Sequence, residues 1–119
     1  MPMTSDEVWD LLEIIASIDR RKLGLTDRQV WERLIGDLAF PDAQAAVEAH
    51  YRDCRDWIMP SDVRQRVRAI RQARLDAAGP TEIPQELAGR PIEAREWLQR
   101  TRDAIADGQE LPKQIGGAA

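Results

Sequence analysis

Residues 4–18 read TSDEVWDLLEIIASI and carry the clearest helical pattern in the chain. Thr4 and Glu7 have the spacing of a capping box, in which each side chain binds a free backbone N–H at the start of a helix. Apolar residues then recur every three or four positions, as on one face of an amphipathic helix. They are Val8, Leu11, Leu12, Ile15 and Ile18. We therefore predict a helix that starts at Thr4, buries this face and ends before Gly24.

The same signals predict three further helices in the first two thirds of the chain. Thr26 and Gln29 have capping-box spacing, and Pro41 suits the first turn of a helix, where a missing N–H costs nothing. Ser61 would cap a fourth helix that ends before Gly79. The apolar face expected for the second helix consists of Val30, Trp31, Leu34, Ile35 and Leu38. No strand-like alternation is present, so we predict an all-α fold with a three- to four-helix domain over residues 1–78.

The remaining third has a different composition. Residues 79–91 hold three prolines and two glycines, which is typical of a linker. We predict one appended amphipathic helix over residues 92–108, stopped by Gly108. Residues 109–119 show no periodicity and are expected to form a frayed tail.

Charge and composition narrow the function. The 119 residues are 43% hydrophobic and 32% charged, with a net charge of -4. Residues 1–60 carry a net charge of -5, whereas residues 61–78 carry +3. No apolar run reaches the ~20 residues of a membrane span. With a single cysteine and no signal-peptide pattern at the N-terminus, the chain is expected in the cytoplasm.

Enzymatic or metal chemistry has little support. His50 is the only histidine, and Cys54 follows four residues later on the same helix face. A metal would need two further ligands. The simpler interpretation places His50 at the edge of the core and Cys54 inside it. With no glycine-rich phosphate loop either, we predict no enzyme activity, no cofactor and no metal site.

An arginine face is the strongest local signal. Arg64, Arg68 and Arg71 recur at helical spacing within residues 61–78. Arginine suits phosphate and carboxylate recognition, so this face is a candidate contact for DNA or for an acidic protein. The alternative is that these arginines pair with the acidic first half of the same chain.

The four tryptophans divide into two groups. Trp9, Trp31 and Trp57 lie on or beside apolar faces and are expected in the core. Trp97 lies beyond the proline-rich segment, on the helix side that also carries Leu98, Thr101 and Ile105. This side is a candidate anchor for a partner groove. The alternative is that the helix folds back and Trp97 completes the core.

Residues 31–71 resemble the small helical loader and inhibitor proteins that tailed phages use on DnaB-type hexameric replicative helicases. The resemblance is carried by three short patterns. They are Trp31, Leu34, Asp37 and Leu38; Ala46, Val47 and Tyr51; and the turn formed by Pro60, Ser61, Asp62, Val63 and Arg64. It implies a helical N-terminal domain, a C-terminal part that engages the helicase, contact with an origin-binding replication protein, and no ATPase motif.

The resulting hypothesis is a non-enzymatic adaptor in phage or prophage DNA replication. Residues 81–107 would hold the helicase, chiefly through Trp97 and Leu98, and the arginine face would meet a second partner. Two alternatives stay open. One is a small DNA-binding regulator that uses the helix over residues 61–78, and the other is a virion or assembly protein that forms a helical oligomer.

Overall fold

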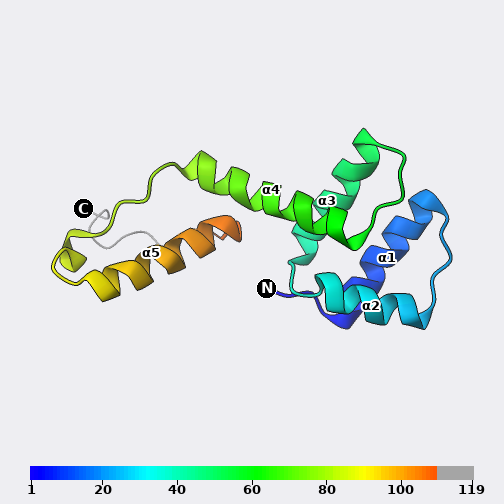
Figure 1. The fold of residues 1–119 in the computed structure, drawn as a ribbon, viewed down its shortest axis with the longest axis horizontal. Helices are drawn as coiled ribbons and strands as arrows, with labels where there is room; N and C mark the ends of the chain where they lie inside the picture. The colour runs from blue at the N-terminus through cyan, green and yellow to red at the C-terminus, as the bar shows by residue number, and fades with distance from the viewer. Residues whose placement is uncertain (110–119) are drawn as a thin grey trace. The chain divides into compact units, whose positions relative to one another are not determined.

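The computed structural model describes residues 1–109 and contains helices and no strands in that part of the chain (Figure 1). The all-α prediction is confirmed. The elements are α1 (Ser5–Asp19), α2 (Leu25–Ile35), α3 (Phe40–Asp53), α4 (Pro60–Ala78), the short 3-10 helix η1 (Gln85–Leu87) and α5 (Pro91–Ala106). The predicted frayed tail, apart from Gln109, lies outside the described residues. None of the helices described is long and apolar enough to cross a membrane.

The chain divides into two units, Met1–Ile70 and Arg71–Ala119, and the division falls within α4. The first unit therefore contains α1, α2, α3 and the start of α4. The second contains the rest of α4, η1 and α5. Residue 78, the predicted limit of the helical domain, is the last residue of α4.

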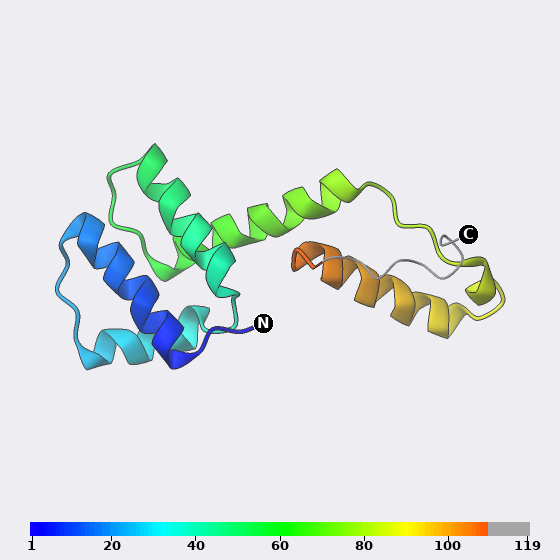
Figure 2. The same ribbon diagram turned by 180° about the vertical axis from the view of Figure 1, so that it is seen from behind.

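The core of the first unit is built around α1. The predicted cap is confirmed, because Thr4 and Glu7 bind each other's backbone N–H groups at 3.1 and 2.9 Å. Four of the five predicted apolar residues are buried, and Ile18 is exposed instead, one residue before the helix ends. Views from both sides show α1 beside α2 and α3, against which it packs (Figures 1 and 2).

The predicted start of the second helix is wrong. α2 begins at Leu25, and Asp27 rather than Gln29 completes its first turn by accepting a 2.8 Å hydrogen bond from the Gly24 N–H. Trp31 and Ile35 are buried, whereas Val30 and Leu34 are exposed. A helix that packs along one side buries a narrower face than the five-residue set predicted from the sequence.

The start of the fourth helix also differs from the prediction. α3 carries Pro41 in its first turn as expected. α4, however, begins at Pro60, so Ser61 lies inside the helix and does not precede it. The residue before the helix is Met59, whose backbone N–H donates to the Asp62 carboxylate at 2.8 Å. Asp62 thus reaches back from the first turn to the N–H ahead of the helix, and Ser61 is not the cap.

The second unit is held together by hydrogen bonds as well as apolar contacts. α5 packs against η1, and Gly108, with a φ of 76°, ends the last turn. Arg71 pairs with Asp107, and Arg74 Nη1 donates to the Ala106 carbonyl oxygen at 2.9 Å. These bonds connect the end of α5 to the second part of α4.

Candidate functional site

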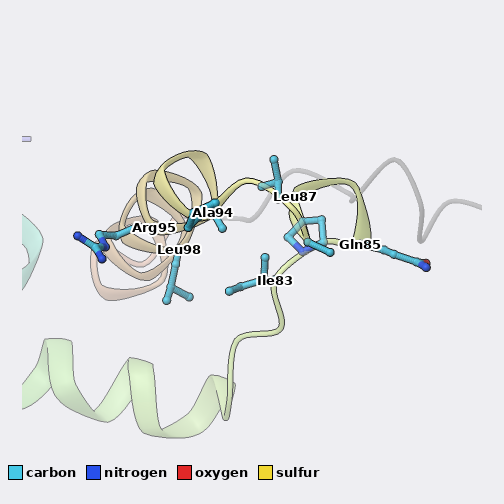
Figure 3. A pocket seen from close by; sticks show the side chains of 9 residues that line it. Ile83, Gln85, Leu87, Ala94, Arg95 and Leu98 are labelled. Carbon is cyan, nitrogen blue, oxygen red and sulfur yellow. The ribbon is translucent and has the colours of Figure 1, made fainter.

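The second unit contains a pocket with a volume of about 490 Å³ between α5 and the chain that leads into it (Figure 3). We call it the α5 pocket. One wall comes from residues 83–88 and the other from α5. Its lining residues are Ile83, Pro84, Gln85, Leu87, Ala88, Pro91, Ala94, Arg95 and Leu98. In Figure 3, Ile83 and Leu98 face one another across the space.

The proline-rich segment forms a defined wall. Pro84 is extended, and the Leu87 N–H donates to its carbonyl oxygen at 3.0 Å, which starts the turn of η1. The Arg90 N–H then donates to the Leu87 carbonyl oxygen, also at 3.0 Å. Pro91 occupies the first turn of α5, where its missing N–H is harmless. Fixed proline φ angles and these turn bonds place Ile83 and Leu87 beside the helix.

The structure brings only part of the predicted anchor into the pocket. Leu98 lines it, whereas Trp97, Thr101 and Ile105 do not, although all four side chains are half-buried. Ile83 and Leu87 were missed, because prolines and glycines in that segment indicated a linker. The signal that could have found them is the apolar spacing of Ile83 and Leu87, four residues apart, just before a helix start.

Two exposed arginines lie along the pocket side of α5. Arg95 lies at its edge, with the guanidinium pointing outward (Figure 3). Arg102 follows seven residues later, on the same side of α5 because seven residues make nearly two full turns. Both side chains are exposed, and neither forms an ion pair with any residue from 1 to 109.

The predicted arginine face of α4 is divided among different partners. Arg64 binds both carboxylate oxygens of Asp37, at 2.6 and 3.0 Å, and donates to the Leu34 carbonyl oxygen at 3.0 Å. The hydrogen bond from Arg64 lowers the pKa of the Asp37 carboxyl, against a smaller opposing effect of burial. Arg66 pairs with Asp53 at 3.3 Å. These contacts support the alternative in which arginines pair with the acidic first half of the chain.

The other two predicted arginines differ from Arg64. Arg71 belongs to the second unit and pairs there with Asp107. Arg68 is exposed and has no ion pair within the part of the chain that the structure describes. A phosphate contact by Arg64 or Arg71 would first have to displace a carboxylate, so Arg68 is the arginine of this set that could meet an anion without that cost.

His50 and Cys54 lie together at the end of α3. The His50 ring is buried, and its Nε2 lies 2.6 Å from the Asp56 carbonyl oxygen and 3.3 Å from the Cys54 sulfur. Cys54 is half-buried and not inside the core. Among residues 1–109, no group of three or more His, Cys, Asp or Glu side chains is arranged to hold a metal ion. His50 thus fastens the end of α3 to the following loop.

A buried polar network links α1, α3 and the loop before α4. Asp19 accepts hydrogen bonds from Arg21 and, at 2.5 Å, from the Tyr51 hydroxyl. The same hydroxyl accepts the Ile58 N–H at 3.0 Å, and Arg21 Nη2 donates to the Ile58 carbonyl oxygen at 2.9 Å. Burial alone would raise the pKa of the Asp19 carboxyl, but these donors outweigh it and hold the pKa below its usual value. We call these residues the Asp19 network.

One tryptophan prediction is wrong, and the network explains why. Trp31 is buried as expected, and Trp9 is half-buried against the core. Trp57, however, is 55% exposed, because the neighbouring Ile58 takes the core position. Its ring lies over the Arg21 guanidinium at 4.9 Å, a cation–π contact.

The α5 pocket offers apolar walls and one cation at its edge. Such a site can hold a bulky apolar side chain of a partner, while the arginine orients a nearby carboxylate. No known family model, curated protein or solved structure matches this chain.

Proposed function

We propose that this protein is a non-enzymatic adaptor that binds a DnaB-type replicative helicase in phage or prophage DNA replication and loads or inhibits it. The observation that carries the proposal is the α5 pocket, an apolar recess that includes Leu98 of the expected helicase-binding segment. The resemblance of residues 31–71 to phage helicase loaders supplies the class of partner. The site of action would be the cytoplasm of the bacterial host.

The two units would have separate roles in such an adaptor. The first unit has a buried core and the Asp19 network, which suit a rigid body. The second unit carries the pocket. An adaptor that holds one partner on each unit raises the effective concentration of one for the other, so it needs no active site. The second partner would be an origin-binding replication protein, or DNA reached through Arg68.

The proposal is tested by capture of the host or phage helicase on the immobilised full-length protein. Ile83→Asp places a charge in the pocket. Ile92→Asp is the matched control, because Ile92 is also an exposed isoleucine of the second unit but does not line the pocket. We expect the unchanged protein and I92D to capture the helicase and I83D to lose most of the capture.

Each other outcome has a definite meaning. If the unchanged protein captures no helicase, the helicase proposal is rejected, and salt-dependent DNA binding with Arg68→Ala becomes the test of the regulator alternative. If I83D captures as well as I92D does, the helicase contact lies outside the α5 pocket. Circular dichroism of both variants checks that the helices are retained.

A further inference from the structure

We propose that the α5 pocket binds an acidic amphipathic helix, whose apolar anchor enters the pocket while carboxylates one turn before and after it pair with Arg95 and Arg102. This inference rests on the proposed function, since it takes the pocket as a protein-binding site. It adds the chemistry of the segment that the partner presents.

The charged residues of α5 are unevenly distributed around the helix. At about 100° per residue, Arg95, Leu98 and Arg102 share one side of the helix. The acidic residues of α5 lie on the other side; they are Glu93, Glu96 and Asp103. Asp103 is also engaged there, because it accepts a 2.9 Å hydrogen bond from Gln99. The pocket side of α5 is therefore positive without any compensating carboxylate among its own residues.

The two arginines are regularly spaced about Leu98. Arg95 precedes Leu98 by one turn, and Arg102 follows it by one turn, so an apolar residue is framed by two cations about 10 Å apart along the helix axis. A partner helix with an aliphatic or aromatic residue framed by Asp or Glu in the same way matches this pattern. A basic helix would place like charges together, which costs affinity.

The α5 pocket has apolar walls and a charged edge. Ile83 and Leu87 line the pocket from the proline-rich side and Leu98 lines it from α5, so an entering side chain meets apolar surface on both sides. Arg95 points outward from the edge, where a carboxylate on the rim of a docked helix would lie (Figure 3). Apolar contact would supply affinity, and the two arginines would select an acidic sequence.

The test uses two fluorescent helical peptides of about 15 residues and the full-length protein. Both peptides carry a central leucine in an alanine- and glutamine-rich helix. One has glutamate one turn before and after the leucine, and the other has lysine at both places. Fluorescence anisotropy at low salt measures each dissociation constant, and we expect the glutamate peptide to bind about tenfold more tightly or better. The preference should shrink as salt screens the charges.

The double variant Arg95→Glu/Arg102→Glu should reverse the preference in favour of the lysine peptide. Arg100→Glu is the matched control, because Arg100 is an exposed arginine on the opposite side of α5, and it should leave the preference unchanged. Equal binding of the two peptides, binding of neither, or a glutamate preference that survives the double reversal would overturn the inference. The peptides contain no helicase sequence, so a failed helicase capture with an intact glutamate preference rejects only the proposed partner.

Discussion

Replacement of Tyr51 by phenylalanine tests whether the Asp19 network stabilises the first unit. The Tyr51 hydroxyl donates to the Asp19 carboxylate at 2.5 Å and accepts the Ile58 N–H at 3.0 Å. The side chain of Asp19 is only 3% exposed, so water cannot easily replace the lost donor. Phenylalanine keeps the ring and removes both bonds, which leaves the Ile58 N–H without its acceptor and the Asp19 carboxylate with only the donors of Arg21.

The magnitude follows from these two losses. A hydrogen bond to a charged group contributes about 1.5–3 kcal/mol, and a buried N–H without a partner costs about 1–3 kcal/mol. We expect Tyr51→Phe to lower the free energy of unfolding by about 3 kcal/mol. For a unit of this size, the loss corresponds to a fall in melting temperature of roughly 12–24 °C.

Urea titration followed by circular dichroism measures the change directly. Ser17→Ala is the control, because the exposed Ser17 hydroxyl donates only to the Ile14 carbonyl of its own helix. We expect that variant to stay within about 0.5 kcal/mol of the unchanged protein. A similarly small effect of Tyr51→Phe would refute the claim that the network contributes to stability.

Three further predictions concern stability. Thr4→Ala removes the cap of α1 and should lower the free energy of unfolding, measured by urea titration, by about 1 kcal/mol. Thr4→Ser keeps a hydroxyl acceptor and should retain most of that stability. Because the folded-state pKa of Asp19 is lowered, its contribution is complete above its unfolded pKa near 4 and is lost as the pH falls through the lower folded value. In this acid range, the melting temperature of Asp19→Asn should fall less steeply with decreasing pH than that of the unchanged protein. An equal slope would contradict the role given to Asp19. Arg64→Gln should lower the free energy of unfolding by less than about 1 kcal/mol, because the Arg64–Asp37 pair is largely exposed. Thermal melting measures the change, and a larger loss would contradict this expectation.

Local signals predicted the helices well where capping and periodicity agreed. In α1, the capping box of Thr4 and Glu7 and the apolar spacing lie within one stretch of chain, so the sequence alone locates the helix. In α2 and α4, two acidic side chains, Asp27 and Asp62, competed with the hydroxyl residues chosen as caps. Both accept the N–H that precedes the helix, and a capping rule based on hydroxyls overlooks them.

Features that join distant residues could not be predicted in this way. The Asp19 network connects residues up to 39 positions apart in the sequence, and no spacing rule brings Asp19, Tyr51 and Ile58 together. The outward position of Trp57 follows from that network. Likewise, the prolines before α5 indicated a break in the helices, but the wall that they form with Ile83 depends on the turn bonds of η1.

Tyr51 is the only tyrosine in the chain, which makes the Asp19 network visible to absorbance spectroscopy. Burial, together with the hydrogen bond to Asp19, raises the pKa of its phenol above the usual 10.0, although the Ile58 N–H acts in the opposite direction. The hydrogen bond joins a neutral phenol to an ionised carboxylate. It is therefore lost at high pH, when the phenol ionises, and at low pH, when the carboxylate is protonated. An alkaline titration of phenolate absorbance records the upper limit of that range at one known position, without any introduced label.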